Sequence, residues 1–342
     1  MLFIAMAVSF VSALFLTPKL IHFLEVIGMV GTDLQKRGRP LVAEMGGPAV
    51  LGGFLLGIFS YVAATVFFYG ERMELVGLFA AIATILIVSL IGLLDDIGSL
   101  SPLRARDSLG NIKRIGLKKW QKPLLTLPAA IPLMAIFAGD SSITIPLIGP
   151  VELGIIFPLV IIPLGVIGAS NAINMLAGMN GLEAGMGSVL LIAMGAFCWV
   201  IGSTTAAAIA LIYAFALLAF LKYNWYPARI MPGDSLLYGI GAVVAVTAIL
   251  GNIEKFALYC FFLWFCELFL KIKSGFKAEN FGVLQADGTL AAPYPKIRSL
   301  THLVMKLGRF TEKQVVLILI GAQILICAVV FYCFVFLNPA IM

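Results

Sequence analysis

Long apolar blocks without a charged residue divide the chain. The blocks 46–70, 75–94, 153–182, 184–221 and 314–342 contain no Asp, Glu, Lys or Arg. A helix that crosses a bilayer needs about 20 apolar residues, and these continuous runs lack the alternating pattern of a membrane β-barrel. Because only helices and closed barrels satisfy their backbone polar groups in hydrocarbon, the pattern predicts an all-α, polytopic integral membrane protein.

Ten transmembrane helices account for the apolar pattern. The block 184–221 is too long for one crossing, and Gly202-Ser203 divides it. The first helix begins at Met1 with no basic segment before it, which favours a retained helix over a cleaved signal peptide. The predicted spans are 1–24, 46–69, 75–94, 122–138, 153–171, 182–201, 204–221, 235–251, 254–271 and 314–337.

Basic residues lie almost entirely on one side of this arrangement. Twenty of the 23 Lys and Arg residues fall in the same-side connections 25–45, 95–122, 222–234 and 271–313. The positive-inside rule places this side in the cytoplasm and both termini outside. Only 12% of the residues are charged, against about 25% in soluble domains, which excludes a soluble protein. The net charge of +6 suits anionic lipid headgroups and anionic substrates, and no nucleic-acid partner is expected.

One loop is long enough to form a substructure. We predict a single membrane-embedded domain over 1–342, with 271–313 as a cytoplasmic loop subregion. Within it, Asp287-Gly288 is typical of a tight hairpin. Apolar residues then recur at helical spacing with basic residues between them, which predicts an amphipathic helix on the inner leaflet. These apolar residues are Leu300, Leu303, Val304, Leu307 and Phe310.

Two adjacent carboxylates, Asp95 and Asp96, directly follow the third predicted span. A carboxylate pair beside hydrocarbon is costly unless a cation neutralises it. Mg²⁺ is a hard ion that prefers carboxylate oxygens and shares its coordination shell with substrate phosphates. The pair therefore indicates a magnesium site, with an exposed helix-end pair of no function as the alternative.

Asparagines and glycines interrupt the apolar sequence between the fifth and sixth spans. Asn171 and Asn174 are spaced to lie on one helical face, and Asn180 follows in the turn. An Asn side chain offers a carbonyl ligand to a cation and an NH₂ donor to phosphate or base oxygens. Gly178 and Gly181 permit a tight turn and a close approach of the backbone to a ligand. The alternative is that all of these residues only form the turn.

A third polar group, Pro232-Gly233-Asp234-Ser235, opens the eighth span. A plain N-cap explains Asp234 by itself. However, Asp95, Asp96, Asn174 and Asp234 all fall on the cytoplasmic ends of their helices, where four oxygen-bearing side chains could assemble one Mg²⁺ site. The first cytoplasmic loop, 31–47, suits either a ligand-binding loop or a solvated connection.

The sequence resembles the polyprenyl-phosphate N-acetylhexosamine-1-phosphate transferases, a family of ten-helix membrane enzymes. Two motifs carry the resemblance: Asn171-Ala-Ile-Asn174-Met-Leu-Ala-Gly178-Met-Asn180-Gly181-Leu182-Glu183 and Tyr223-Asn224-Trp225-Tyr226-Pro227. They are similar to the branch that transfers N-acetylglucosamine 1-phosphate to dolichyl phosphate, in an archaeal-type form. Relatives that make peptidoglycan precursors carry Asp at the position of Ala177 and an HxH-type motif in the last cytoplasmic loop. This chain has no His between 271 and 301, which disfavours that branch.

The resemblance implies a reaction and its components. UDP-GlcNAc and a polyprenyl (dolichyl) phosphate would give polyprenyl diphosphate-GlcNAc and UMP, as the first membrane step of glycan assembly, expected to be that of an N-glycan. The implied cofactor is Mg²⁺, or Mn²⁺ in its place. The enzyme would lie in the plasma membrane of a prokaryote or the endoplasmic reticulum of a eukaryote, with its active site facing the cytoplasm.

The resemblance also assigns residues. Asn174 and Asp234 would bind the metal and bridge it to the diphosphate. Asp95 and Asp96 match the family's aspartate pair, one of which has been proposed as base or nucleophile, and Lys122 would hold the phosphates. The substrate-binding residues implied by the match are Leu34, Glu44, Asn171, Asn180, Gly181 and Lys277.

Two alternatives to this function stay open. A related transferase could use another UDP-HexNAc donor, because the sugar-contacting loop matches least well. A membrane transporter is a second class, but its coupling residues are expected near the bilayer midplane. The mid-span positions of 75–94 and 184–221 carry no ionisable acid or base of the Asp, Glu, Lys or Arg type, which argues against transport. The sequence leaves the oligomeric state open, with a homodimer as one candidate.

Overall fold

The computed structural model describes residues 1–68, 75–100, 121–145 and 149–337 of the chain. Within this described part, eight helical segments are long and apolar enough to cross a membrane. They are α1 (Leu2–Val26), α2 (Gly47–Ala63) continued by η1 (Ala64–Phe68), α3 (Leu75–Leu100), η3 (Phe157–Ile161) with α6 (Ile162–Met175), α7 (Leu182–Val200), α8 (Thr204–Asn224), α9 (Gly233–Gly251), and α13 (Glu312–Tyr332) with η4 (Cys333–Leu337). The all-α membrane class predicted from the sequence is confirmed.

Two of the ten predicted spans are interrupted helices in the structure. The predicted span 122–138 is divided into α4 (Gln121–Thr126), the 3₁₀ turn η2 (Leu127–Ala130) and α5 (Ile131–Ala135). Pro123, Pro128 and Pro132 lie in this stretch, and proline removes the backbone donor that a regular helix needs.

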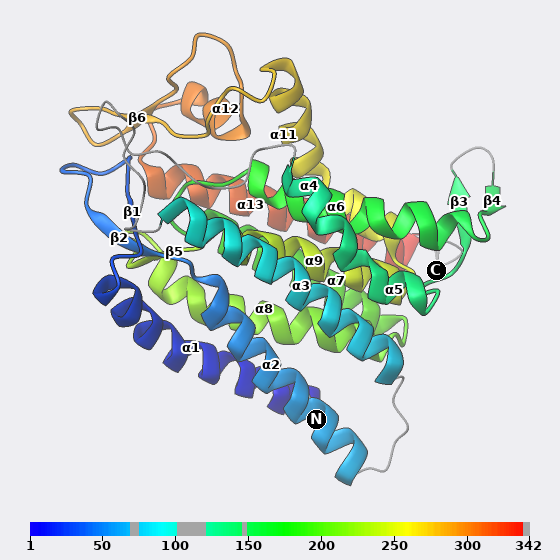
Figure 1. The fold of residues 1–342 in the computed structure, drawn as a ribbon. Helices are drawn as coiled ribbons and strands as arrows, with labels where there is room; N and C mark the ends of the chain where they lie inside the picture. The colour runs from blue at the N-terminus through cyan, green and yellow to red at the C-terminus, as the bar shows by residue number, and fades with distance from the viewer. Residues whose placement is uncertain (69–74, 101–120, 146–148, 338–342) are drawn as a thin grey trace.

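The predicted span 254–271 is also divided. It forms α10 (Glu254–Cys260) and α11 (Phe262–Lys273), with a break at Phe261. α11 turns away from the bundle towards the loop subregion (Figure 1). There, the buried Glu267 carboxylate accepts hydrogen bonds from Ser299 Oγ at 3.1 Å and from the Leu300 amide at 2.8 Å. The charge of Glu267 would be costly in hydrocarbon, but here its carboxylate is hydrogen-bonded to loop residues.

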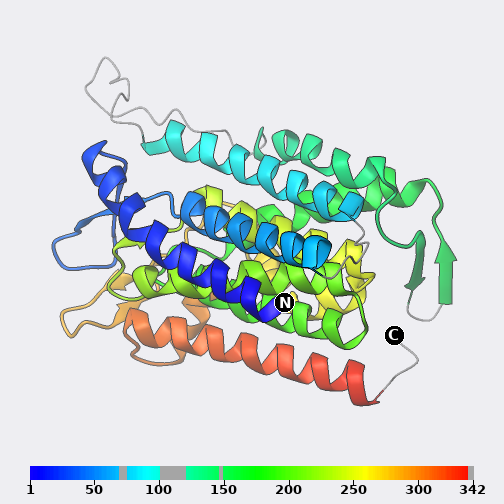
Figure 2. The same cartoon turned by 90° about the horizontal axis from the view of Figure 1, so that it is seen from below.

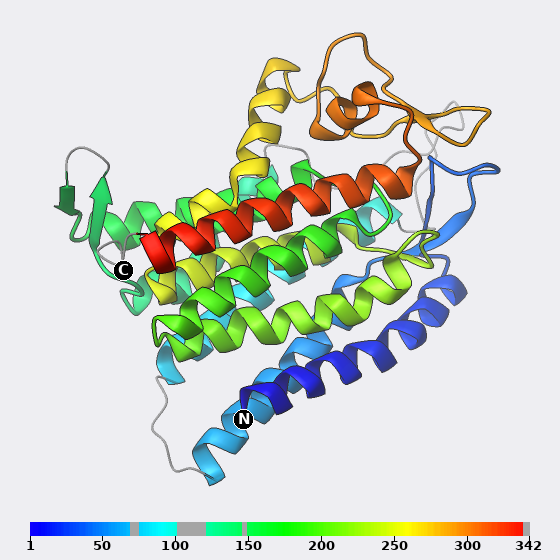
Figure 3. The same cartoon turned by 180° about the vertical axis from the view of Figure 1, so that it is seen from behind.

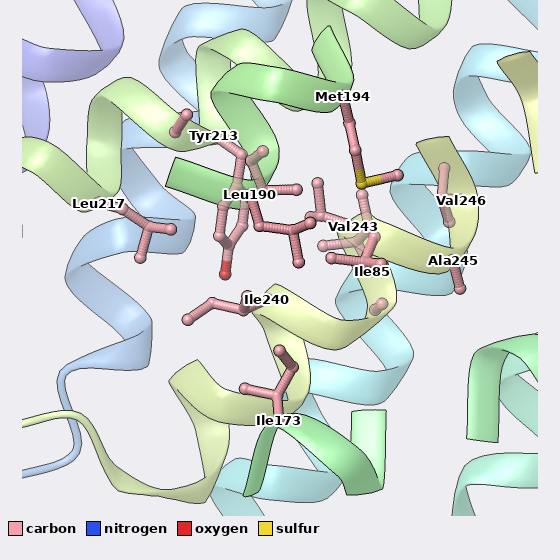
Figure 4. Packing of buried hydrophobic residues seen from close by; sticks show 14 of the residues in the cluster. Ile85, Ile173, Leu190, Met194, Tyr213, Leu217, Ile240, Val243, Ala245 and Val246 are labelled. Atoms are coloured by element: carbon pink, nitrogen blue, oxygen red, sulfur yellow. The ribbon is translucent and has the colours of Figure 1, made fainter. Parts of the chain in front are cut away.

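Helix α9 lies at the centre of the bundle. In the most apolar stretch of 18 residues in each helix, 89% of the residues are buried in α9, against 33% in α1 and 28% in α13. Figure 4 shows Ile240 and Val243 of α9 packed among side chains from the surrounding helices, including Ile85 of α3 and Leu190 of α7. Seen from below, α13 lies at the opposite edge of the bundle from α3 and α5 (Figure 2). Neighbouring helices on several sides therefore hold α9, and with it the residues at its ends, in place.

Helix α3 approaches α9 unusually closely at one position. A Cβ atom on Gly92 would lie 2.5 Å from the carbonyl oxygen of Asp234. Only a glycine permits this contact, so the crossing brings the end of α3 against the start of α9.

In the described residues, three small sheets join the helices, and only the last of them was predicted. β1 (Val30–Thr32), β2 (Leu41–Glu44) and β5 (Ile230–Met231) form a sheet in the order β1-β2-β5, antiparallel and then parallel. β3 (Ser142–Ile145) pairs with β4 (Gly149–Glu152), and β6 (Val283–Leu284) pairs with β7 (Leu290–Ala291). The β6–β7 pair encloses Asp287-Gly288, as expected, and Gly288 has a φ of +86°. The first sheet ties the loop before α2 to the segment that enters α9.

The two ends of the bundle differ. The β1-β2-β5 sheet and the β6–β7 hairpin lie at one end, whereas β3, β4 and the start of α1 lie at the other (Figure 1). Viewed from behind, α13 runs along the bundle to the end that carries the loop subregion 271–313 (Figure 3). The described parts of the segments predicted to share one side of the membrane thus gather at one end of the molecule (Figure 1).

The predicted amphipathic helix is present as α12 (Leu300–Leu307). Its surroundings differ from the prediction, because Leu300, Val304 and Met305 are buried within the protein. Leu307 remains 73% exposed. The protein interior covers Leu300 and Val304, whereas Leu303 and Leu307 stay exposed, so contact of α12 with the inner leaflet stays a prediction.

Candidate active site

The two adjacent aspartates lie inside the last turns of α3. This helix continues to Leu100, beyond the predicted end of the span at residue 94, so both Asp95 and Asp96 are buried. The Asp96 carboxylate accepts hydrogen bonds from the amides of Asp234 at 2.7 Å and Ser235 at 3.0 Å. Amides in the first turn of a helix have no partner within the helix and favour negative charge. Asp96 therefore caps α9 from a neighbouring helix.

Lys122 joins Asp95 to the start of α9. Its Nζ lies 2.6 Å from Asp95 Oδ2 and 2.6 Å from Asp234 Oδ2. Lys122 is outside the eight candidate spans, at the start of α4. Burial lowers its pKa, but the charge of Asp234, the nearby Tyr238 and the hydrogen bonds to Asp234 and Asp95 together raise the pKa above its usual range. The ammonium group is therefore charged at neutral pH.

Asn174, in the last turn of α6, completes the group. Its Nδ2 donates to Asp234 Oδ1 over 2.9 Å. Side chains from α3, α4, α6 and α9 thus meet at the loop end of the bundle. We call this group the carboxylate cluster and define it as Asp95, Asp96, Lys122, Asn174 and Asp234.

One residue beside the cluster was not singled out from the sequence. Tyr238 is fully buried on α9, one turn after Asp234, and its ring centroid lies 5.9 Å from the Lys122 ammonium. The sequence does contain a signal for Tyr238: it lies four residues after Asp234, and residues four apart share a helix face.

The hypothesis of one Mg²⁺ site on four oxygen-bearing side chains, Asp95, Asp96, Asn174 and Asp234, stays a prediction. Both Asp96 oxygens accept backbone amides. Among the residues that the structure describes, no group of three or more His, Cys, Asp or Glu side chains is arranged to hold a metal ion by itself. Asp234 and Asn174 nevertheless supply the hard oxygen atoms that Mg²⁺ uses, and Mg²⁺ usually takes one or two carboxylates plus substrate phosphates. These two residues fit such a shared site.

The observed hydrogen bond of Asn171 lies outside the carboxylate cluster. Its Nδ2 donates to the carbonyl of Ile167 in its own helix, over 2.8 Å. Although Asn171 and Asn174 lie one turn apart, their side-chain amides bond to different partners. A role of Asn171 in substrate binding stays a prediction.

Asn180 belongs to a second polar group, which we call the Asn180 cluster: Asp33, Lys36, Asn180 and Glu312. Asn180 Nδ2 donates to Asp33 Oδ2 at 3.1 Å, and Asn180 Oδ1 accepts the amide of Ala228 at 2.9 Å. The Lys36 ammonium lies 3.2 Å from Asp33 Oδ2, pairs with Glu312, and sits over the Tyr226 ring. The Asn180 side chain thus holds three loops together, and its contact with uridine stays a prediction.

The other predicted substrate-binding residues lie around the same end of the molecule. Glu44 is in β2, opposite Met231, and its carboxylate covers Gly31. Gly181 occupies the N-cap position of α7 with a φ of +83°. Leu34 is 43% exposed beside Asp33, and Lys277 is exposed in the loop after α11. All four residues lie in or beside the loops at the end of the bundle that holds the carboxylate cluster, and the negative charge of Glu44 acts on Asp96.

Two further residues hold the segment that follows Asn174. Asn280 Nδ2 donates to the carbonyls of Met175 at 2.7 Å and Ala177 at 2.9 Å. Gln35 Nε2 donates to the Gly178 carbonyl at 3.0 Å, while Gln35 Oε1 accepts the Gly282 amide. No local pattern marks these residues in the sequence, because their partners are more than 100 residues away.

Fold and site together define a multi-pass membrane protein with a buried, lysine-containing acidic site where its helices meet the loops. Residues 78–252 match the glycosyl transferase family 4 model, and the chain belongs to this family.

Named relatives cover most of the chain. A protein of Saccharolobus solfataricus is 37% identical over 300 residues, 86% of this chain and 84% of its own length. One of Sulfolobus acidocaldarius is 33% identical over 332 residues, covering 96% and 95%. Both provisionally carry the name UDP-N-acetylglucosamine–dolichyl-phosphate N-acetylglucosaminephosphotransferase. The protein of that name from Dictyostelium discoideum is 25% identical over 358 aligned positions, covering 90% and 82%.

Proposed function

We propose that this protein transfers N-acetylglucosamine 1-phosphate from UDP-GlcNAc to a polyprenyl phosphate of the dolichyl type. The products are polyprenyl diphosphate-GlcNAc and UMP. The observation that carries the proposal is the carboxylate cluster, in which Lys122 lies 2.6 Å from Asp95 and from Asp234 in a chain of glycosyl transferase family 4. The names of the relatives support the choice of donor and acceptor.

The location of the cluster suits these two substrates. The donor is water-soluble, whereas the tail of the acceptor stays in lipid, so the reacting phosphates have to meet at the membrane surface. Asp95 and Asn174 lie near the ends of α3 and α6, and Asp234 lies at the start of α9. The basic residues in the described loops at this end support a cytoplasmic location under the positive-inside rule.

Phosphoryl transfer depends mainly on positioning and charge neutralisation. Asp234 and Asn174 would hold a divalent ion, Mg²⁺ or Mn²⁺, which when bound neutralises charge on the donor diphosphate. Lys122 provides a further positive charge for the phosphates. Asp96 keeps the first turn of α9, and with it Asp234, in place.

The acceptor phosphate is already an anionic nucleophile near neutral pH. We favour its direct in-line attack on the sugar-bearing phosphorus: a new phosphorus–oxygen bond forms, and the bond to the UMP oxygen breaks. Asp95 is better placed than Asp96 to take a remaining acceptor proton, because both Asp96 oxygens accept amides of α9.

A panel of labelled donors tests the proposal. Purified protein in nanodiscs receives a short polyprenyl phosphate and UDP-GlcNAc, UDP-GalNAc or another UDP-acetamido sugar, each labelled in the sugar. We expect labelled lipid and an equal amount of UMP with UDP-GlcNAc, loss of both in EDTA, and recovery with Mg²⁺. Asp234→Asn should reduce the rate by at least about a hundredfold.

The panel also separates the alternatives. Preference for another UDP-HexNAc would keep the chemistry and change the donor. Uptake of a nucleotide sugar into sealed vesicles without UMP release would indicate a transporter instead. Lys255→Met, at the other end of the bundle, serves as the matched control and should retain the wild-type rate.

A further inference from the structure

Lys122 occupies an unusual position for a residue that would bind phosphate. In the structure, its ammonium group makes contacts of 2.6 Å with Asp95 Oδ2 and with Asp234 Oδ2. Contacts this short are charge-assisted hydrogen bonds. The lysine is thus bound to the carboxylate to which the proposed function assigns the divalent ion.

Asp234 cannot keep all of these contacts when it binds an ion. Its Oδ1 accepts the Asn174 amide, and its Oδ2 accepts the Lys122 ammonium. Mg²⁺ would approach a carboxylate oxygen to about 2.1 Å, so its charge would repel an ammonium group bound to the same carboxylate. Either cation can therefore hold Asp234, but both cannot do so in the observed geometry.

The exposure of the side chains gives the ion a direction of approach. The side chain of Asp95 is 3% exposed, whereas those of Asp234 and Lys122 are 20% and 22% exposed. An incoming ion meets Asp234 and Lys122 first, with Asp95 behind them. The flexible lysine stem lets the ammonium group move towards the same open side, where an anionic diphosphate would lie.

We propose that Lys122 is a built-in counter-cation: in the metal-free protein its ammonium holds Asp95 and Asp234 together, and it leaves Asp234 when a divalent ion binds. This inference rests on the proposed metal site and adds a second role for Lys122, as a competitor of the ion. It also explains how buried carboxylates from α3 and α9 remain adjacent before substrates arrive, since unpaired buried charges are strongly destabilising.

Metal binding without substrates tests the competition. Mn²⁺ binding is measured by electron paramagnetic resonance for wild type, Lys122→Met and the control Lys255→Met, all in nanodiscs without nucleotide. Methionine has a flexible side chain of nearly the same length and carries no charge. We expect Lys122→Met to bind Mn²⁺ about tenfold more tightly than wild type, because no ammonium competes for Asp234. The control should bind like wild type, and Asp234→Asn should abolish binding in each background.

Stability supplies a second readout. In EDTA, Lys122→Met should unfold at a lower temperature than wild type, and Mn²⁺ should raise its unfolding temperature by more than it raises that of wild type. A residue that only binds substrate phosphate would change neither quantity.

A measurement on the wild-type protein does not depend on the folding of a variant. Chemical acetylation followed by mass spectrometry should show Lys122 becoming more reactive when Mn²⁺ is added, while Lys255 stays constant. Equal Mn²⁺ affinity in wild type and Lys122→Met, with unchanged reactivity of Lys122, would overturn the inference and leave the proposed function intact. Absence of Mn²⁺ binding from both proteins would overturn the metal site and the inference together.

Discussion

At the scale of single residues, two neighbours in the sequence have different tasks. Asp95 pairs with Lys122, whereas Asp96 accepts two amides from the first turn of α9. They point to different partners because successive residues of a helix lie about 100° apart around its axis. Of the two aspartates, Asp95 is therefore the catalytic candidate and Asp96 is the cap of α9.

The capping of α9 by Asp96 leads to a prediction about Gly233. This residue has a φ of +69°, and a Cβ there would lie 2.6 Å from Asp96 Oδ2. Gly233→Ala should lower the free energy of unfolding by about 1–3 kcal/mol and reduce the transfer rate, because Asp96 and Asp234 would shift. Thermal unfolding and the UMP assay check both effects.

Gly275→Ala is the matched control for Gly233. Gly275 has a similar φ of +62°, but no atom lies within 4 Å of the site of a Cβ. It should lose stability through backbone strain and keep its transfer rate. Equal activity of the two variants would contradict the assignment of Asp96 as the cap.

At the scale of elements, α12 illustrates how burial changes the meaning of a pattern. Its apolar residues were expected to lie on lipid, but the helix packs into the loop subregion with His302 fully buried. His302 Nε2 lies 3.4 Å from the carbonyl of Phe281. Burial, together with the positive charges of Lys271 and Lys306, lowers the pKa of His302 below the usual value of a histidine, about 6.5, although the Phe281 contact opposes this.

This burial predicts that the loop subregion loosens in mild acid. A histidine with a lowered pKa stays neutral in the folded state, so the unfolded state binds more protons as the pH falls below 6.5. As the pH falls below 6.5, the free energy of unfolding should decrease from its value at pH 7.5 by up to about 1.4 kcal/mol per pH unit. Hydrogen exchange of α12 at pH 7.5 and 5.5 measures the effect. His302→Gln, which cannot titrate, should flatten it, and an unchanged pH dependence in this variant would refute the role of His302.

At the scale of the whole molecule, the asymmetry of charge predicts the orientation in the membrane. The loops that carry most basic residues lie at one end of the bundle, and the β3–β4 hairpin lies at the other (Figure 1). Local sequence predicts this arrangement, because each apolar segment reverses the direction of the chain across the membrane.

Single cysteines test this orientation. In intact cells, a membrane-impermeant maleimide should label Asp140→Cys, in the segment before β3, but should label Glu279→Cys only after lysis. Both positions are exposed. The unmodified protein, with its five cysteines in or near helices, gives the background. Labelling of Glu279→Cys alone in intact cells would invert the proposed orientation and place the site outside.

By itself, the sequence determined the membrane class, the approximate positions of the spans and the helix-end location of Asp95, Asp96, Asn174 and Asp234. These features depend on the length and polarity of continuous segments, which are local properties. It missed the breaks in two segments and the pairings β1-β2-β5 and β3–β4, because short interruptions and short pairings were outweighed by overall apolarity.

Only the tertiary structure decided which partner each polar side chain takes. Lys122 meets Asp234 across 112 positions, and Asn180 meets Asp33 across 147. Such pairings depend on how helices rotate and pack around α9, where Gly92 allows a close crossing. No pattern within one helix encodes that rotation, because it follows from packing against all the neighbouring helices at once.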